Sequence, residues 1–510
     1  MKARIETILL ALLLLSALPN VAQAQYYYTN SYGIWSYTPG TGTVAIAGLI
    51  NIPLNGVVVI PDTINGYPVT TIGNSAFDQM SGLTKVTIGT NAISIGSSAF
   101  NLCYGMKSIT IGKSVTNIGE SAFDGCWGLT NIAIPNSVAS LGNYAFQSCF
   151  ALTNVMIGSG ITSIGSEAFS GCNSLINISV APANSSFSSV AGVLFDKSQT
   201  TLIEYPGGKA GSYSTPSSVT SIGSDAFEFC SSLTGVTIPG SVISFGDFAF
   251  SQCTGLASVA IPDSVTSLGL NVFDRCTGLT NISVDPANPT FSSMAGVLFD
   301  RSQMTLIEYP CGKTGSYSIS SGVNTIGDSA FSQCTGLTGV IIPDSVTSIG
   351  VDAFAFCTSL TSVTIGSGLI NSLFSGLGSY AFSDCPKLAK VYIRGNSPTP
   401  ANDLTVFSGD TNAIVYYQPD TTGWGALFDG LPTWNPQLSG GGSNMGVQNH
   451  QFGFSISGNN NLVVVVEACT NVAGPVWLSV STNTLAGGTN YFSDPQWTNY
   501  PARFYRLSAQ

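Results

Sequence analysis

The chain has 510 residues, of which 44% are hydrophobic and only 8% are charged, with a formal net charge of −11. Globular proteins usually carry about a quarter charged residues, so we expect this surface to consist mainly of uncharged Ser, Thr, Asn and the 57 glycines. The 15 basic residues are scattered. This argues against nucleic acid and anionic membranes as partners, because both need clustered Lys and Arg.

The first 24 residues are typical of a secretory signal peptide. Lys2 and Arg4 give a positive start, a short apolar run extends from Ile8 to Leu15, and a small-x-small cleavage site ends at Ala24. No later run reaches the roughly 18 apolar residues of a membrane-spanning helix. We therefore expect a mature chain without a membrane span, secreted or on the outer cell surface; an uncleaved anchor is the alternative.

From residue 69 onward the chain repeats one unit. Glycines recur 23 residues apart, at Gly73, Gly96, Gly119, Gly142 and Gly165. The 23-residue spacing resumes at Gly223, Gly246 and Gly269 and again at Gly327 and Gly350, and the series ends at Gly378. A fixed period in the twenties predicts a solenoid, in which each coil is stable only because it stacks on its neighbours.

One unit shows how a coil should fold. Leu152, Val155 and Ile157 have the L-x-x-L-x-L spacing of a short strand. Gly165 permits a tight turn and positive φ, and Ser166 stands where a short helix would need an N-cap. Successive coils should stack at strand spacing, about 4.8 Å, and share one apolar interior.

The pattern IGxxAFxxCxxLxxVxIPxSV resembles the BspA-type, or Treponema-type, leucine-rich repeat over residues 69–394. The resemblance implies an α/β, β-rich leucine-rich-repeat solenoid of 23-residue coils, with an N-terminal cap at 25–68 and a C-terminal cap at 395–437. Caps are needed because an open sheet end would expose unpaired backbone groups. Family members are implicated in adhesion and in binding host or matrix proteins, so the resemblance also implies extracellular recognition.

Two inserts interrupt the period, near residues 181–215 and 285–319. PANSSFSSVAGVLFDKSQTTLIEYPGGK in the first matches PANPTFSSMAGVLFDRSQMTLIEYPCGK in the second. Alternating apolar residues predict a hairpin in each, and the GSYS segments that follow should rejoin the stack as strands. Duplication of a three-repeat block explains this match as well as a shared function does.

Ten of the twelve cysteines occupy one phase of the repeat, and Met80 fills the same slot in the first unit. Because a thioether cannot form a bridge, we expect this slot to hold buried free thiols, although neighbouring coils would be close enough for disulfides. Cys311 and Cys469 are off phase, and Cys311 is the better candidate for a reactive thiol. We expect no metal site, since the single histidine, His450, lies outside the array.

Candidate catalytic residues are few. His450 is the only base for a Ser-His-Asp or Cys-His triad, and a solvated loop histidine is the simpler interpretation. The insert carboxyls, Asp196 with Glu204 and Asp300 with Glu308, could serve a glycosidase, although solvated hairpin charges explain them too. We predict that the chain is not an enzyme and uses no cofactor, with a carbohydrate-active enzyme as a third hypothesis.

The exposed strand positions are the expected binding surface, because solenoids bind through extended surfaces of this kind. They are nearly uncharged, rich in hydroxyl and amide groups, and have few large anchors of the type that dominate protein interfaces. Such a face suits weak polyvalent contact with a polymer or glycan, and equally a structural ribbon. The candidate ligand-binding residues are Thr110, Asn131, Asn154, Met156, Asn177, Thr237, Ser258, Asn281, Ile341, Thr364, Tyr392 and Arg394.

The tail begins with a flexible Gly-Ser linker at 438–446. Residues 447–510 alternate in hydrophobicity between turns and predict a small β-sandwich. Its segments EACTNVAGPVW and RFYRL resemble the C-terminal module of secreted proteins in Verrucomicrobia-like bacteria. Attachment to the envelope, assistance in export and a simple folding cap are all compatible with this resemblance.

The sequence therefore favours a secreted or surface-associated bacterial solenoid that recognises an extracellular protein or polysaccharide. The alternative is a structural protein of the envelope or matrix that has no specific ligand.

Overall fold

The computed structural model describes residues 26–371, 376–397, 404–417, 421–434, 437–439, 445–448, 451–458, 463–471 and 476–509. The predicted signal peptide and His450 lie outside these residues. Within the described ranges the secondary structure is β-strand with short 3-10 turns and no α-helix. The chain divides into two compact units: unit 1 comprises Met1–Ala210 and Ser218–Ser232, and unit 2 comprises Gly211–Ser217 and Leu233–Gln510.

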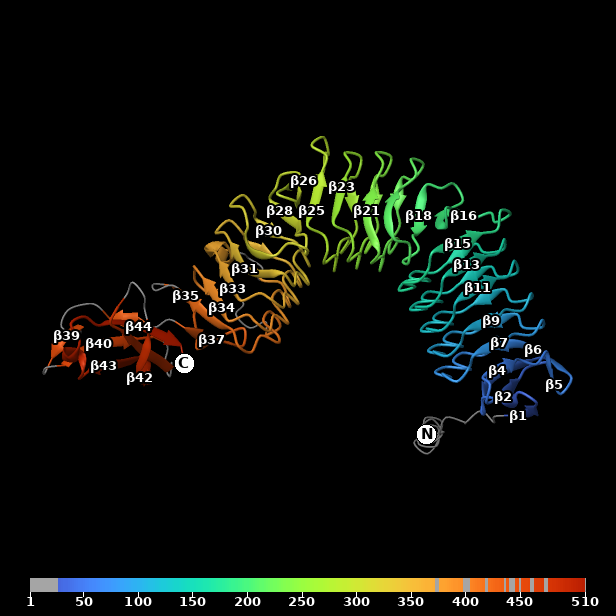
Figure 1. Cartoon of the computed structure of the whole chain (residues 1–510), viewed down its shortest axis with the longest axis horizontal. Helices are drawn as coiled ribbons and strands as arrows, with labels where there is room; N and C mark the ends of the chain where they lie inside the picture. Colours follow the sequence, from blue (N-terminus) through green and yellow to red (C-terminus); the bar gives the residue numbers. More distant parts are fainter. Residues whose placement is uncertain are drawn as a thin grey trace, which may run out of the picture. The chain divides into compact units, whose positions relative to one another are not determined.

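Each regular coil of unit 1 contributes one long and one short strand, and strands of each kind run parallel from coil to coil (Figure 1). The long strands are β4 (Val57–Val59), β7 (Lys85–Thr87), β9 (Ser108–Thr110), β11 (Asn131–Ile134), β13 (Asn154–Ile157) and β15 (Asn177–Val180). The short strands are β8 (Ser94–Ile95), β10 (Asn117–Ile118), β12 (Ser140–Leu141), β14 (Ser163–Ile164) and β20 (Ser221–Ile222). Asn131 pairs with Asn154 and Asn154 with Asn177, so the register equals the predicted period.

Unit 2 repeats this plan. Its long strands are β19 (Gly211–Ser214), β21 (Leu233–Thr237), β23 (Ser258–Ile261), β25 (Asn281–Val284), β29 (Gly315–Ser318), β31 (Leu337–Ile342), β33 (Ser362–Ile365), β34 (Lys390–Ile393), β35 (Ile414–Tyr417) and β37 (Leu431–Trp434). Its short elements are β22 (Ser244–Phe245), β24 (Ser267–Leu268), β30 (Thr325–Ile326), β32 (Ser348–Ile349) and the 3-10 turn η1 (Ser367–Asn371).

Both ends of the array carry extra strands. At the N-terminal end these are β1 (Tyr26–Asn30), β2 (Gly33–Pro39), β3 (Val44–Leu49), β5 (Thr63–Ile64) and β6 (Tyr67–Ile72). The first three form an antiparallel meander, and β3 then pairs in parallel with β6, which joins the short strands. At the C-terminal end β36 (Leu427–Phe428) turns back antiparallel on β37. Each addition pairs backbone groups that the end coil would otherwise leave open.

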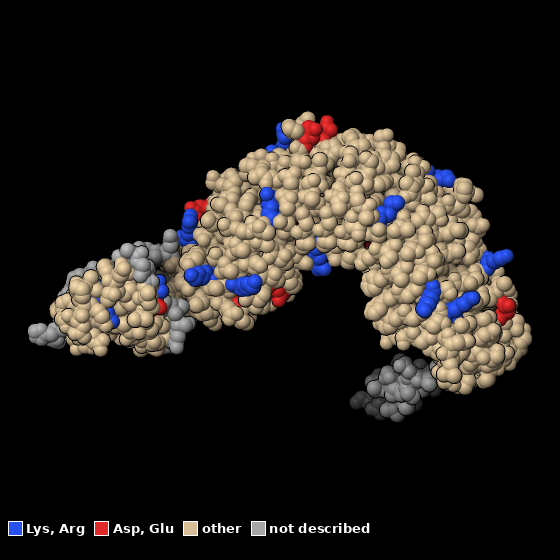
Figure 2. Space-filling view, in the orientation of Figure 1, with Lys and Arg blue, Asp and Glu red and all other residues tan. Residues whose placement is uncertain are grey.

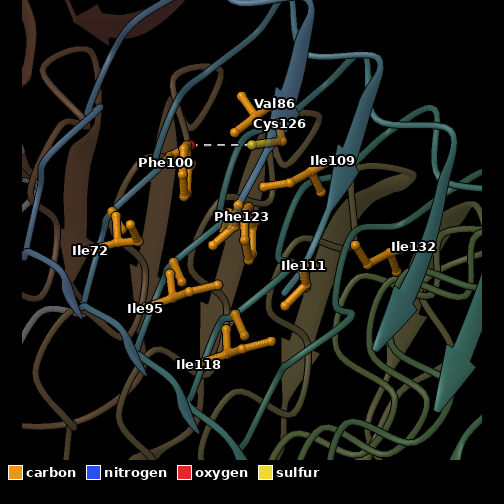
Figure 3. Packing of buried hydrophobic residues seen from close by; sticks show 14 of the residues in the cluster. Ile72, Val86, Ile95, Phe100, Ile109, Ile111, Ile118, Phe123, Cys126 and Ile132 are labelled. Atoms are coloured by element: carbon orange, nitrogen blue, oxygen red, sulfur yellow. Dashed lines mark hydrogen bonds between the residues drawn. The ribbon is translucent and has the colours of Figure 1, made fainter. Parts of the chain in front are cut away.

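A ladder of phenylalanines fills the interior between the two sets of strands. In unit 1, Phe77, Phe100, Phe123, Phe146 and Phe169 are buried, and consecutive ring centroids lie 4.8 to 5.8 Å apart with planes within 9° of parallel. Figure 3 shows two of these rings beside the isoleucines of the short strands. Burial of each ring contributes roughly 1.5–3 kcal/mol, but only when the next coil covers it.

The predicted short helix with an N-cap at Ser166 is wrong, because residues 165–172 form a turn. Its backbone N–H groups bond across coils, as Phe146 N–H does to the carbonyl of Ala168 at 2.9 Å. Positive φ occurs at Glu167 (54°) rather than at the glycine. Gly165 is needed for a different reason, since a Cβ there would clash with the backbone nitrogen of Asn143 in the preceding coil.

The cysteine slot is filled by buried thiols, as predicted, in nine of the ten in-phase positions. Cys126 Sγ donates to the carbonyl of Phe100 at 3.2 Å (Figure 3), and the other regular coils repeat this contact. Burial raises the pKa of Cys103 to about 12, which keeps this thiol protonated. The tenth, Cys334, forms a disulfide with Cys311, so the prediction of a reactive Cys311 thiol is wrong.

The inserts form the predicted hairpins. In the first these are β16 (Phe187–Val190), β17 (Val193–Asp196) and β18 (Thr201–Glu204), and in the second β26 (Phe291–Met294), β27 (Val297–Asp300) and β28 (Thr305–Glu308). The GSYS strands β19 and β29 rejoin the stack in parallel, as predicted. A buried asparagine ties each hairpin down: Asn184 Nδ2 donates to Gly158 and Ile161 carbonyls, while its Oδ1 accepts from two insert N–H groups.

The tail contains two antiparallel sheets. One comprises β38 (Gln437–Ser439), β39 (Met445–Gln448), β40 (Gln451–Ser457) and β43 (Thr489–Asp494), and the other β41 (Val463–Cys469), β42 (Leu478–Thr484) and β44 (Phe504–Ala509). Phe454 and Ile456 of the first sheet pack in one buried cluster with Val464 and Val466 of the second. The first strand begins at Gln437, ahead of the expected boundary at 447, because both sides of the glycine segment pair with β40.

Candidate functional site

The sheet face of each unit consists of the outward-pointing residues of its long strands. In unit 1 these residues form two rows. Asn131, Asn154 and Asn177 are in register in the first row, and Asn154 Nδ2 donates to Asn131 Oδ1 at 3.0 Å. Because the strands are parallel and in register, identical positions of successive coils align. The sequence prediction that these amides share one face therefore agrees with the structure.

The second row lies in a groove of about 930 Å³ along the C-terminal ends of β9, β11, β13 and β15. Thr110, Ala133, Met156 and Ser179 line it, and Met156 is 59% exposed. Lys113 is the one charged residue of its lining. Such a groove can bind a ligand through apolar and hydroxyl contacts, but its side chains offer no pair for acid–base chemistry.

Two residues of this groove, Ala133 and Ser179, were absent from the predicted set. Both pair directly with Met156 across the sheet. The signal that could have found them is the register, because each lies two positions after a selected asparagine. The sequence pattern places both at exposed strand positions, but neither was chosen as a candidate ligand-binding residue.

In unit 2 the structure brings together Ile341, Thr364 and Tyr392, which pair in one row across β31, β33 and β34. Tyr416 of β35 extends this row, with its ring centroid 5.1 Å from that of Tyr392. Sequence reasoning missed Tyr416, because it lies in the segment assigned to the cap. The row is thus longer and more aromatic than predicted.

Arg394 lines a separate hollow of about 640 Å³ together with Ser318, Ile341 and Asp344. Here one basic and one acidic side chain border a largely hydroxyl surface. The remaining predicted residues of unit 2 are exposed on their strands but line neither hollow: Thr237, Ser258 and Asn281.

The two carboxyl groups of each insert lie in different environments. Asp196 accepts hydrogen bonds from Thr201 N–H at 2.7 Å and Thr200 Oγ1 at 2.9 Å, and so closes the turn between β17 and β18. Glu204 lies at the far end of β18 and lines a hollow of about 150 Å³. In the second insert Asp300 accepts from Thr305 N–H, and Glu308 lines a hollow of about 190 Å³.

A shortened turn explains both hollows. Tyr205 stacks on Phe227 and bonds to the carbonyl of Ala226, so LIEY of the insert replaces the longer IGxxAF of a regular coil. Glu204 thereby occupies the position that a buried alanine has in a regular coil. The turn of the insert is two residues shorter than the regular turn. Burial raises the pKa of Glu204 and of Glu308 well above the usual value.

Within the described residues, no group of three or more His, Cys, Asp or Glu side chains is placed to hold a metal ion. In the same ranges, no helix has the length and hydropathy needed to cross a membrane.

Comparisons with known proteins concern the array. The profile of the BspA type leucine rich repeat region matches residues 70–201, 207–314 and 308–403. No curated protein matches the chain. Similar solved structures include a leucine-rich repeat protein from Bacteroides ovatus, with 25% identity, coverage of 72% of this chain and 95% of that chain, and a TM-score of 0.41. A leucine rich cell surface protein from Faecalibacterium prausnitzii shows 26% identity, coverage of 79% and 96%, and a TM-score of 0.41. The pneumococcal vaccine antigen PcpA shows 20% identity, coverage of 78% and 95%, and a TM-score of 0.41.

Proposed function

Because the chain belongs to the BspA-type leucine-rich repeat family, we propose that it is a secreted or cell-surface protein that recognises an extracellular protein or polysaccharide through its sheet face. The groove of unit 1 is the observation that carries this proposal. Thr110, Ala133, Met156 and Ser179 line it side by side, while the buried apolar residues of the same strands complete the interior beneath. Met156 is more than half exposed, so its side chain is not needed to fill the interior.

The composition of the groove favours binding over catalysis. Its lining combines hydroxyl groups, apolar side chains and a single cation. On the surface drawn in Figure 2, charged side chains are few and most of the area is uncharged. A neutral surface of this kind fits a neutral polymer or a polar protein segment better than a polyanion.

Two features support export. The first 24 residues have the composition of a signal peptide. The Cys311–Cys334 disulfide is of a kind that persists in oxidising compartments and is rare in the cytosol.

Retention experiments test the proposal. Mature protein, residues 25–510, is passed over immobilised bacterial cell walls, matrix proteins and polysaccharides. We expect retention on at least one, and a loss of about tenfold or more in affinity for Thr110→Lys with Met156→Lys, because two cations would then occupy the groove. Thr364→Lys tests the row of unit 2 in the same way. Thr254→Lys adds a cation at an exposed turn residue outside the sheet face and should leave retention unchanged.

A structural role without a specific ligand is the alternative. The parallel stacking of coils within each unit favours it, since an array can serve as a spacer without binding anything. Absence of retention on every surface would support this role over recognition. Retention that survives all the lysine substitutions would move recognition away from the sheet face.

A further inference from the structure

Three consecutive coils of unit 1 carry an aromatic residue immediately after the ladder cysteine. Tyr104, Trp127 and Phe150 are 36%, 45% and 43% exposed. Their ring centroids lie 4.2 Å apart from Tyr104 to Trp127 and 5.7 Å apart from Trp127 to Phe150. These three residues form the aromatic row, a continuous exposed apolar strip along the stack.

The other coils show what the fold itself requires at this position. There the residue is small or polar, in the order Ser81, Asn173, Ser231, Thr254, Thr277, Thr335, Thr358 and Pro386. The backbone forms the same turn in all of these coils. Stacking therefore does not call for a large ring, and three adjoining exposed rings are the kind of apolar patch that marks a binding surface.

The geometry of the rings differs from that of the interior ladder. Buried phenylalanines of unit 1 stack with planes within 9° of parallel. In the aromatic row the planes are tilted by 39° and 34°. Each of the three side chains nevertheless keeps more than a third of its surface exposed, so part of each stays accessible to a ligand.

Polar rows border the aromatic row on both sides. Three residues before each ring lie Asn101, Asp124 and Gln147, and three residues after each ring lie Lys107, Thr130 and Thr153. Three residues span at most about 11 Å, so the backbone of each of these residues lies within that distance of the backbone of a ring residue. All six are at least partly accessible to solvent. The charges of Asp124 and Lys107 cancel, and the other four residues carry amide or hydroxyl groups. The apolar strip is therefore flanked in sequence by residues with no net charge.

We propose that the aromatic row is a binding site for a linear polysaccharide, whose sugar rings lie on Tyr104, Trp127 and Phe150. A pyranose ring presents an apolar C–H face and a rim of hydroxyl groups, which matches an aromatic strip with hydrogen-bonding borders. Nucleic acid bases also stack on such rings, but their phosphates require clustered cations, and Lys107 is the only cation in the two bordering rows.

This site is distinct from the groove in which we place sheet-face recognition. The aromatic row precedes the N-terminal ends of β9, β11 and β13, whereas the groove lies at their C-terminal ends. The two sites can therefore be removed separately. Recognition by the groove does not depend on the aromatic row, and the reverse also holds.

Trp127→Thr tests the proposal, because threonine is the residue that other coils carry at this position, so the fold should be retained. Native mature chain and variant are compared by affinity electrophoresis and calorimetry with soluble β-glucan, xylan and mannan. We expect the native chain to bind at least one of them, and Trp127→Thr to weaken binding about tenfold or more, as for an anchor ring at an interface. Phe356→Gln is the matched control, because Phe356 is 46% exposed and lies outside the aromatic row.

Three outcomes would overturn the proposal. The native chain could bind none of the polysaccharides. Binding could survive Trp127→Thr and be lost in Met156→Lys, which would place the glycan in the groove and support the sheet-face function instead. Trp127→Thr could abolish binding of a matrix protein while no polysaccharide binds, which would make the row a protein interface.

Discussion

At the scale of single residues, the cysteine slot shows how one position of the repeat can hold different chemistry. In the last coil VFSGD takes the place of AFSGC, so Asp410 occupies the slot of a ladder cysteine. Asp410 is 2% exposed, its Oδ1 accepts the N–H of Cys385 at 2.6 Å, and its Oδ2 has no hydrogen-bond partner. Burial, with a smaller contribution from the charge of Asp384, raises the pKa of Asp410 to about 7.

This carboxyl should make stability depend on pH. In the unfolded chain an aspartate titrates near 3.9, so the folded state holds its proton more tightly between about pH 4 and pH 7. Stability from this group therefore falls as pH rises through that window, by at most about 4 kcal/mol. Asp410→Asn cannot ionise and should lack this loss. Urea unfolding of both proteins at pH 4.5 and pH 8 measures the difference.

The substitution is informative because Asn keeps an acceptor for the N–H of Cys385. We expect Asp410→Asn to gain stability relative to the native chain at pH 8 but not at pH 4.5. An equal effect at both pH values would mean that folding does not shift the pKa of the Asp410 carboxyl.

At the scale of elements, the inserts depart from the repeat in one consequential way. Each contains a hairpin followed by a coil whose register is 20 residues, from Leu202 to Ile222 and from Leu306 to Ile326. Past this shortened stretch, the residue after the YP pair lies 23 residues, one full period, before a ladder cysteine. In the first insert this residue is Gly207, and in the second it is Cys311, which bridges to the ladder.

Cys311→Gly copies the first insert into the second. The disulfide joins residues 23 apart, and its loss should lower the free energy of unfolding by about 3 kcal/mol on the chain-entropy argument. The turn itself should survive, since Gly207 occupies the same place. Denaturant unfolding with and without reductant checks this.

Reductant supplies the control for this substitution. The native chain in reductant should resemble the variant, and reductant should have little effect on the variant. If Cys311→Gly unfolds at the same denaturant concentration as the oxidised native chain, the bridge does not contribute to stability.

At the scale of the whole molecule, the stack is held together by contacts between neighbouring coils. Stacked rings, thiol hydrogen bonds and backbone hydrogen bonds all join residues about one period apart in neighbouring coils. Stability of such an array is close to a sum of coil terms and neighbour terms. The array can therefore be lengthened or shortened only by whole coils.

Removal of residues 247–269, one full period, should leave a folded chain. Gly246 would then be followed by Leu270, and the phase of strands, rings and cysteines would continue. We expect a melting temperature lower by only a few degrees, because one neighbour interface is lost among many. Circular dichroism and thermal melting provide the readout.

Removal of residues 247–257 is the matched control, because it deletes about half a period and turns apolar positions outward. This shorter deletion should lose cooperative unfolding. If the full-period deletion were the more damaging of the two, the coils would not be interchangeable.

The sequence alone determined the solenoid, its 23-residue period, the two hairpin inserts, the return of GSYS to the stack and the buried cysteine phase. These follow from local patterns, because the regular contacts recur at fixed offsets from one coil to the next. It also placed Asn131, Asn154 and Asn177 on one face, since register follows from period.

Only the tertiary structure decided the features that break the period. The hollows at Glu204 and Glu308 and the extension of the Tyr392 row to Tyr416 depend on which side chains meet where a coil is shorter or the array ends. The Cys311–Cys334 bridge depends on how the insert rejoins the stack. The turn without a helix belongs with them, because its N–H groups bond to another coil. A repeating sequence specifies the contacts that recur in every coil, whereas contacts made once, at an insert or an end, depend on distances that exist only once the chain is folded.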